Sequence, residues 1–419
     1  MQTRMAWLTG MAAGGILGVA VLAQGPGQGQ PTPIAPVQAP KPQRDPGRLP
    51  PLQRQMFFGA RRGADWLQRC NRPDGRFGYV STPALRVRTE NDHYLRQVGA
   101  ALTLARSARY FGDERAAALA TQAVLTLLVA TAPDDAKNPQ YRHTSVPSTA
   151  VNRLAAAGLL VRAVHELPTP ANDLLDQADQ LCNYLRRQQR ADGSLTSGDV
   201  AGGSPSSDDS EISDFLAAEA LHGLIFSHQR RPAPWKIDVL RKAIAYYHPR
   251  WRARKTLAVV PGLTAAWTEA YLLTREQTFA DAIFEMNDWL CTLQYQRPDP
   301  QRPLWLGGFM GWADGKSVPQ PPESGSACYA ESLAAACRVT RHLGDALRHG
   351  RYREALERCL QFLTTLQFTE ANTQHFAEWY RAEVVGGFYV SQQDGNLRLD
   401  STCHAVCALL DYLTHVAEP

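Results

Sequence analysis

The sequence lacks the short motifs that identify several large enzyme classes. It contains no GxGxxG after a strand-like run, no GxxxxGK[ST], no HExxH and no GxSxG. These motifs carry dinucleotide binding, phosphate binding, zinc-protease chemistry and the serine nucleophile of α/β-hydrolases. The eight cysteines form no CxxC pair and show none of the Cys/His spacings typical of a structural zinc module. The sequence therefore predicts no metal site and no cofactor.

A concentrated positive charge is also missing. Forty-four basic and 40 acidic residues leave a formal charge of +4, and the basic residues are spread along the 419-residue chain. Nucleic-acid binding needs a basic patch or stripe, so we expect no nucleic-acid partner. A hydrophobic fraction of 44% is ordinary for a globular protein and sufficient for a large buried core.

The N-terminal quarter of the chain has two unusual segments. Residues 1–23 hold one early positive charge, a small-residue apolar run and the ending Val21-Leu22-Ala23, which is typical of a secretory signal peptide. An uncleaved N-terminal membrane anchor is the alternative, because the run is just long enough to span a bilayer. Residues 24–51 are rich in Pro and Gln and predict a disordered linker. We expect export to the periplasm or cell envelope, and a folded domain over 52–419.

A degenerate repeat organises that domain. An aromatic-Leu pair, followed by Gln and a Gly-bearing turn, recurs at Trp66-Leu67, Tyr184-Leu185, Trp289-Leu290 and Phe362-Leu363, with Gln188 as the glutamine of the second copy. Weaker copies lie at 127–128 and 246–247. Between and after these marks lie Ala/Leu-rich segments with helical spacing, roughly 92–110, 148–165, 211–228, 263–275, 327–345 and 400–416.

Twelve helices in this order form six helical hairpins. One hairpin cannot bury its apolar faces alone, so the hairpins are expected to stack. Six of them can close into a two-layered ring, with an open solenoid as the structural alternative. No segment shows sustained strand alternation. The sequence predicts an all-α fold, an (α/α)6 toroid.

This repeat resembles that of the α/α-toroid superfamily, which includes terpenoid cyclases, protein prenyltransferases and the six-hairpin glycosidases and epimerases. The resemblance covers about the whole of 52–419. It implies an active cavity at one mouth of the barrel, lined by the starts of the inner helices. Because the repeat motif is degenerate, it supports a prediction of the fold more than a prediction of an activity.

Polar residues stand at most of those helix starts. The candidate catalytic residues are Asp400, His404, Glu331 and Glu211, and the candidate substrate-binding residues are Asp92, Arg96, Arg153, Arg398 and Tyr329. Asp400 and His404 are four residues apart, so one helical face can present a carboxylate beside an imidazole. Each polar cluster alone is also what helix capping produces. The expected convergence of the inner-helix starts around one mouth of the barrel is what favours a functional site over simple helix capping.

One segment is similar to the last hairpin of protein prenyltransferase β-subunits. There, a run like Gly386-Gly387-Phe388 precedes an Asp and a zinc-binding His, as Asp400 and His404 follow it here. Ser326-Ala327-Cys328 occupies the place of their zinc-binding Asp and Cys, but Ser326 replaces the Asp. The spacing from Asp400 to His404 is also one residue longer.

Carboxylates, arginines and aromatic residues at one mouth suit chemistry on sugars, where acid/base groups act beside residues that bind hydroxyl or carboxylate groups. We therefore expect an exported protein that binds or processes a cell-envelope polysaccharide, acting as a monomer. The alternatives are a non-catalytic interaction scaffold and a prenyltransferase- or terpene-cyclase-like enzyme. The sequence alone does not decide whether the protein is an enzyme.

Overall fold

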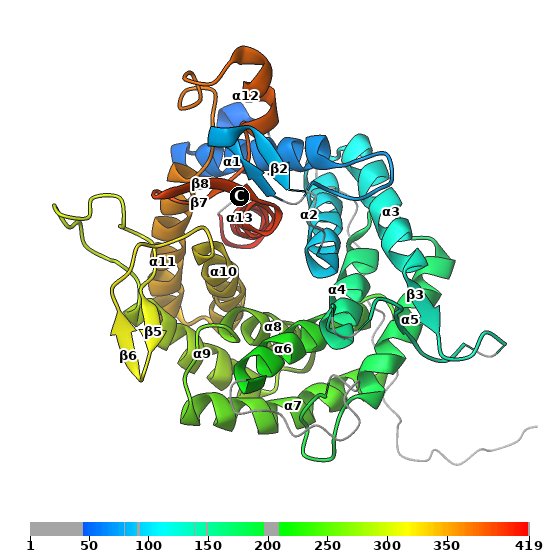
Figure 1. Cartoon of the computed structure of the whole chain (residues 1–419). Coiled ribbons are helices and arrows are strands. Elements are labelled where there is room, and N and C mark those ends of the chain that lie inside the picture. The colour runs from blue at the N-terminus through cyan, green and yellow to red at the C-terminus, as the bar shows by residue number, and fades with distance from the viewer. Residues whose placement is uncertain are drawn as a thin grey trace, which may run out of the picture. The chain divides into compact units, whose positions relative to one another are not determined.

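The computed structural model describes residues 45–78, 80–89, 93–137, 139–147, 150–196 and 209–417. These residues fold into two concentric layers of helices (Figure 1). The predicted signal peptide and nearly all of the linker lie outside the described residues. The first α-helix of the described residues, α1, begins at Pro51. No helix in the described ranges is both long and apolar enough to cross a bilayer.

Six helices form the inner layer of the ring. They are α2 (Tyr94–Phe111), α4 (Arg153–Glu166), α6 (Asp209–His228), α8 (Val260–Thr274), α10 (Ser326–Leu343) and α13 (Leu399–Asp411). Consecutive inner helices pack against each other, and α13 packs against both α10 and α2. The last inner helix thus contacts the first, and the ring closes. The open solenoid is wrong, and the (α/α)6 toroid is confirmed.

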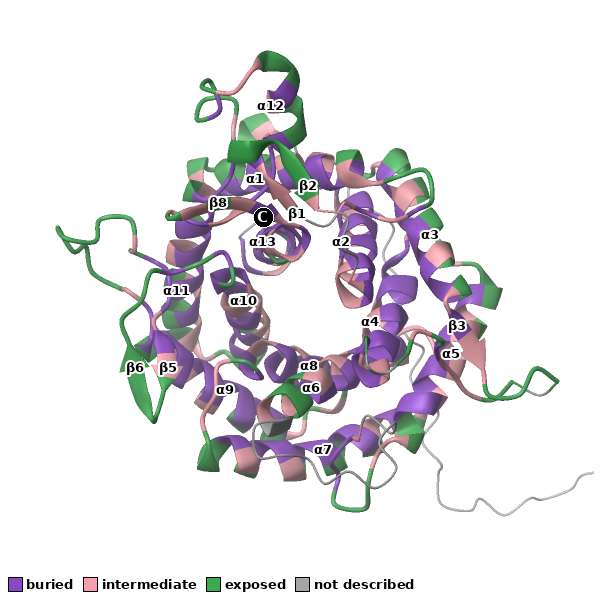
Figure 2. Cartoon of the chain, in the orientation of Figure 1, coloured by how far each residue is buried: buried purple, intermediate pink, exposed green. Residues whose placement is uncertain are grey.

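Six further helices form the outer layer. They are α1 (Pro51–Cys70), α3 (Glu114–Val129), α5 (Asn172–Arg187), α7 (Pro234–Ala253), α9 (Gln277–Thr292) and α11 (Ala346–Thr365). A short extra helix, α12 (Glu378–Val384), projects from the ring. Burial follows the layers, because the faces between inner and outer helices are buried while the outward faces of the outer helices are exposed (Figure 2).

Side-chain caps fix several helix starts. Asp113, Asn152 and Asp345 precede α3, α4 and α11, and each accepts a hydrogen bond of 3.0 Å from a backbone N–H in the first turn. These bonds satisfy amide groups that have no partner inside the helix. Asp113, Asn152 and Asp345 therefore act as N-terminal helix caps.

The glutamine of the repeat ties neighbouring hairpins together. The Nε2 of Gln294 donates to the carbonyl of Gly307 at 3.0 Å and to that of Ala355 in the next outer helix at 2.8 Å. Gln367 makes the equivalent pair of bonds to Gly386 and Gly59, which joins the last hairpin to the first. In the second copy Gln189, and not Gln188, makes these bonds. Buried backbone carbonyls thereby gain partners.

The glycine of the repeat has a matching physical reason. Gly193, Gly307 and Gly386 have φ values of 93°, 89° and 98°, a region that favours glycine. A Cβ at each would also overlap a backbone carbonyl of the next outer helix. The Gly-bearing turn therefore lies directly against the backbone of the next outer helix.

Short strands, which the sequence did not predict, lie at one end of the ring. β1 (Val80–Thr82), β2 (Val87–Thr89), β7 (Tyr389–Ser391) and β8 (Asp394–Arg398) form one antiparallel sheet in the order β2-β1-β8-β7. Two hairpins, β3 (Thr131–Pro133) with β4 (Arg142–Thr144) and β5 (Gly311–Ala313) with β6 (Lys316–Val318), lie elsewhere around the ring. Strands of three to five residues are too short to show a clear alternation. The β1–β8 pairing joins the first hairpin to the last beside the start of α13.

The cysteines are free thiols, and most of them are buried. All eight lie in the described ranges, and none forms a disulfide. Five of the six buried ones lie within helix interiors as small apolar residues.

Candidate active site

Polar side chains near the starts of several inner helices contact one another across neighbouring helices. Arg96 in the first turn of α2 pairs with Asp400 at the start of α13. Glu331 near the start of α10 pairs with His404 on α13. Glu211 in α6 accepts a hydrogen bond from Thr256, which lies just before α8. These contacts link neighbouring inner helices in pairs.

Asp400 lies between two arginines. Its Oδ1 and Oδ2 accept bonds from Arg398 Nε at 3.1 Å and Nη2 at 2.7 Å, and Arg96 Nε lies 3.1 Å from Oδ2. Burial alone would raise the pKa of Asp400, but the bonds from Arg398 and the charge of Arg96 outweigh it and lower the pKa. Asp400 is therefore ionised at neutral pH. We call these three residues the Asp400 cluster.

Strand β8 positions Arg398 in this cluster. Arg398 is its last residue and stands opposite Val80 of β1 in the register. Its backbone is extended, and the next residue begins α13. The bidentate bond to Asp400 raises the pKa of Arg398 further. A cation from the strand and one from α2 thus converge on one carboxylate.

A second cluster lies one helical turn along α13. The Nδ1 of His404 is 2.8 Å from Oε1 of Glu331, and donor atoms of Cys328, Glu331 and His404 all lie within 4.8 Å of one another. The charge of Cys328 and then that of Glu331 raise the pKa of His404 well above its usual value. We call these three residues the His404 cluster.

The sequence predicted that Asp400 would accompany His404 on one helical face. The two do lie on α13 one turn apart, but each finds its hydrogen-bond partner on another element. Asp400 bonds to Arg398, and His404 bonds to Glu331 of α10. Cys328, which was not among the predicted site residues, completes the second cluster.

The remaining predicted residues have other surroundings. Glu211 bonds to Thr256 on the α6–α8 side of the ring. The ring of Tyr329 packs edge-on against Phe309 at 5.1 Å, and burial raises its pKa, as expected for an aromatic residue at the edge of the core. Arg153 is the first residue of α4. Asp92 lies outside the described residues.

Further into the barrel, charged side chains from all six inner helices form a network that the sequence analysis missed. We call it the interior ion-pair network; its members are Arg106, Arg109, Arg162, Glu166, Glu219, Glu269, Arg338 and Asp411. Four arginines balance four carboxylates. The only sequence signal was single charged residues within helices that otherwise read as apolar.

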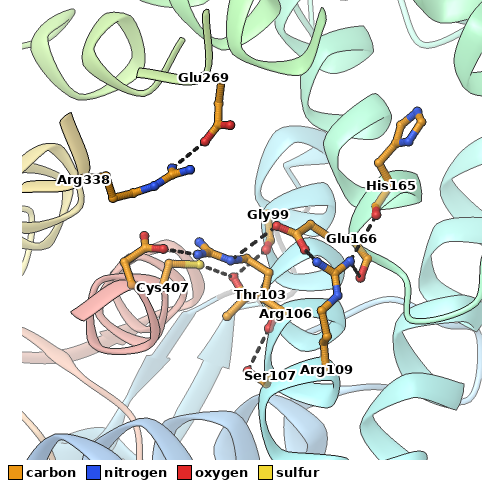
Figure 3. A network of polar contacts seen from close by, with 11 residues as sticks. Gly99, Thr103, Arg106, Ser107, Arg109, His165, Glu166, Glu269, Arg338 and Cys407 are labelled. Atoms are coloured by element: carbon orange, nitrogen blue, oxygen red, sulfur yellow. Dashed lines mark hydrogen bonds and ion pairs between the residues drawn. The ribbon is translucent and has the colours of Figure 1, made fainter. Parts of the chain in front are cut away.

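Figure 3 shows most of this network. Arg106 of α2 contacts Asp411 of α13, and its Nε lies 3.5 Å from Glu166 of α4. Arg109 also pairs with Glu166, at 2.7 Å, and Arg338 pairs with Glu269 at 2.5 Å. Charges withdrawn from water are tolerated only when paired in this way. Each pair joins two inner helices, so these ion pairs connect α13, α2, α4 and α6 in series and, separately, α8 with α10.

A groove of about 560 Å³ lies on the outer wall, lined in part by Arg252, Glu285, Asp288 and Arg348. Its charged residues pair with one another or with neighbours. None of the residues predicted for the site lines it. The mouth, where two polar clusters meet, therefore remains the candidate active site.

Comparisons with known proteins were made by sequence and by structure. No family model matches the sequence, and no curated protein matches it. Solved structures do match over nearly the whole chain. A heparin-specific unsaturated glucuronyl hydrolase aligns with a TM-score of 0.57 and 13% identity, covering 85% of this chain and 96% of that one.

Two other neighbours have similar values. A D-mannose isomerase has a TM-score of 0.61 at 11% identity, covering 87% of this chain and 99% of its own. A cellobiose 2-epimerase from Bacillus thermoamylovorans has a TM-score of 0.60 at 10% identity, covering 87% and 98%. At these identities the comparison establishes the six-hairpin toroid fold and leaves function to the site.

Proposed function

We propose that this protein is an exported carbohydrate-processing enzyme that acts as a monomer and holds its substrate at the mouth formed by the starts of α2, α10 and α13. The observation that carries the proposal is the adjacency of the Asp400 and His404 clusters on α13. The structural neighbours supply a second support, because the three described above are a hydrolase, an isomerase and an epimerase of sugars. A cell-envelope polysaccharide is the proposed substrate, since the N-terminal segment is typical of exported proteins.

The two clusters suit two tasks. In the Asp400 cluster, Arg96 and Arg398 present N–H donors held in place by one carboxylate, an arrangement suited to sugar hydroxyl or carboxylate groups. In the His404 cluster, Glu331 and His404 are polar side chains in hydrogen-bond contact, so one can accept a proton while the other donates. Substrate held by the first cluster would lie within reach of the second, one helical turn away.

Glycan binding by the mature protein tests this proposal. Acidic and neutral polysaccharide fragments would be titrated by calorimetry against wild type, Arg398→Gln and the control Asp238→Asn. Asp238 lies on the outer helix α7, 59% exposed, in an ion pair with Arg241. We expect binding by wild type and the control, and a loss of roughly tenfold or more in Arg398→Gln, because charged hydrogen bonds are worth about 1.5–3 kcal/mol.

Thermal melts of the same variants separate this function from the scaffold alternative. If Arg398 acts on the ligand, its replacement lowers glycan affinity at a nearly unchanged melting temperature. A lower melting temperature with full glycan affinity would assign the Asp400 cluster to fastening the last hairpin. Absence of binding to every glycan class would refute the proposal.

A further inference from the structure

The His404 cluster combines three different donor types. Cys328 and Glu331 lie three residues apart on α10 and therefore share one face, and His404 reaches them from α13. Their sulfur, carboxylate oxygen and imidazole nitrogen lie within 4.8 Å of one another. Ligands around one tetrahedral ion bound at 2.0–2.3 Å are roughly 3.3–3.8 Å apart, so small side-chain rotations would bring these atoms to a common centre.

Charge balance distinguishes this cluster from the Asp400 cluster and from the interior ion-pair network. The carboxylates of Asp400, Asp411, Glu166, Glu219 and Glu269 each pair with an arginine. Within the described residues, Glu331 pairs only with His404, and no lysine or arginine forms an ion pair with it. The cluster thus contains a carboxylate and a thiol, both able to carry negative charge, around a single imidazole. A bound cation would supply the missing positive charge.

We propose that Cys328, Glu331 and His404 bind one divalent transition metal ion of the zinc type. A thiolate, an imidazole and a carboxylate are the donors that zinc accepts, and three protein ligands with an open fourth position are typical of catalytic zinc sites. The side chain of His404 is 47% exposed, so the cluster is accessible from solvent. Glu331, the third donor, belongs to no metal-binding pattern in the sequence.

Such an ion would lie beside the Asp400 cluster, one turn of α13 away. Its chemistry would be that of a Lewis acid toward an oxygen of the bound ligand. This catalytic use rests on the proposed function, whereas metal binding itself does not.

Cobalt substitution tests the site directly. The mature protein is treated with a chelator, freed of it, and titrated with Co²⁺ while its absorption spectrum is recorded. We expect one equivalent to bind and give a thiolate-to-cobalt charge-transfer band in the near ultraviolet, with visible bands typical of four-coordinate cobalt. Zn²⁺ should then remove these bands by displacement.

Variants identify the ligands. Cys328→Ser should abolish the charge-transfer band, and His404→Gln and Glu331→Gln should weaken binding by roughly tenfold or more. Cys70→Ser is the matched control, because Cys70 is also half-buried and unpaired but lies at the end of α1. Circular dichroism confirms that each variant is folded.

The outcomes separate the two proposals. A wild-type protein that takes up neither Co²⁺ nor Zn²⁺ at micromolar concentration overturns the metal site, as does a charge-transfer band that survives in Cys328→Ser. Glycan titration is read independently. Metal uptake without glycan binding would retain the metal site and reject the carbohydrate function. Glycan binding without metal uptake would retain the carbohydrate function and reject the metal site.

Discussion

Arg106 provides the sharpest test of how the barrel interior is stabilised. Its side chain is 15% exposed and contacts Asp411 of α13 and Glu166 of α4. Replacement by Met keeps much of the aliphatic stem but removes the charge. Glu166 would keep its bond to Arg109, whereas Asp411 would lose the one ion-pair partner that the described residues give it.

The expected loss follows from that difference. Removing one member of a buried ion pair costs about 3–5 kcal/mol, because the remaining charge is left without compensation. Arg106→Met leaves only the carboxylate of Asp411 without a partner, and that side chain is 18% exposed. We therefore expect a loss of stability near the lower end of this range, about 3 kcal/mol. The double variant Arg106→Met/Asp411→Leu removes both charges. It should recover most of the loss, since an apolar pair can replace a buried ion pair at little cost.

Equilibrium urea unfolding at pH 7, followed by circular dichroism, measures both effects. Arg241→Met is the matched control. Arg241 is 51% exposed on the outer helix α7 and pairs with Glu276, so its loss should cost under about 1 kcal/mol. The reasoning is refuted if Arg106→Met is no more destabilising than this control, or if the double variant is no more stable than the single one.

Two further predictions concern other positions on the inner helices. In Gly158→Ala, the new Cβ would lie 2.6 Å from the Cα of Ala220 in α6, so we expect a loss of about 2–4 kcal/mol in urea unfolding; Gly99→Ala, where nothing lies within 4 Å, should change stability by under about 1 kcal/mol. Equal losses in the two variants would contradict a tight crossing. His165 is 1% exposed, and burial lowers its pKa to about 3. The unfolded chain binds this proton near pH 6.5 and the folded chain does not, so stability should fall as the pH drops below about 6.5. Between pH 7 and 5 the His165→Leu variant should lose about 2 kcal/mol less than wild type, and parallel pH profiles would disprove the assignment.

The fold was predictable because each hairpin repeats one set of local requirements. The aromatic-Leu pair, the glutamine and the glycine recur at several of the junctions between outer helices, and Gln294 with Gly307 shows the bonds that require them. Ring closure could be expected from six units, since hairpins at the ends of an open stack would leave apolar faces exposed.

The partners within the site were harder to predict. Spacing along one helix places Asp400 and His404 on the same face, but it does not tell which side chain the neighbouring helix presents. Glu331 meets His404 across the contact between α10 and α13. Asp400 meets Arg96 because α13 packs against α2, which lies about 300 residues earlier in the chain. Such contacts depend on tertiary packing, which periodicity does not contain.

The contact of α13 with α2 also sets an order of events during synthesis. A ribosome releases the chain from its N-terminus, and the early hairpins can stack as they emerge. About 300 further residues are synthesised after Arg96 before its partner Asp400 leaves the exit tunnel. Until then, the face of α2 that packs against α13 is not covered by that helix. A chain that stops before α13 would lack the last wall of the barrel and both polar clusters at once. Completion of the ring and completion of the candidate site are therefore a single late step, and prematurely terminated chains should lack the candidate site and be prone to aggregate.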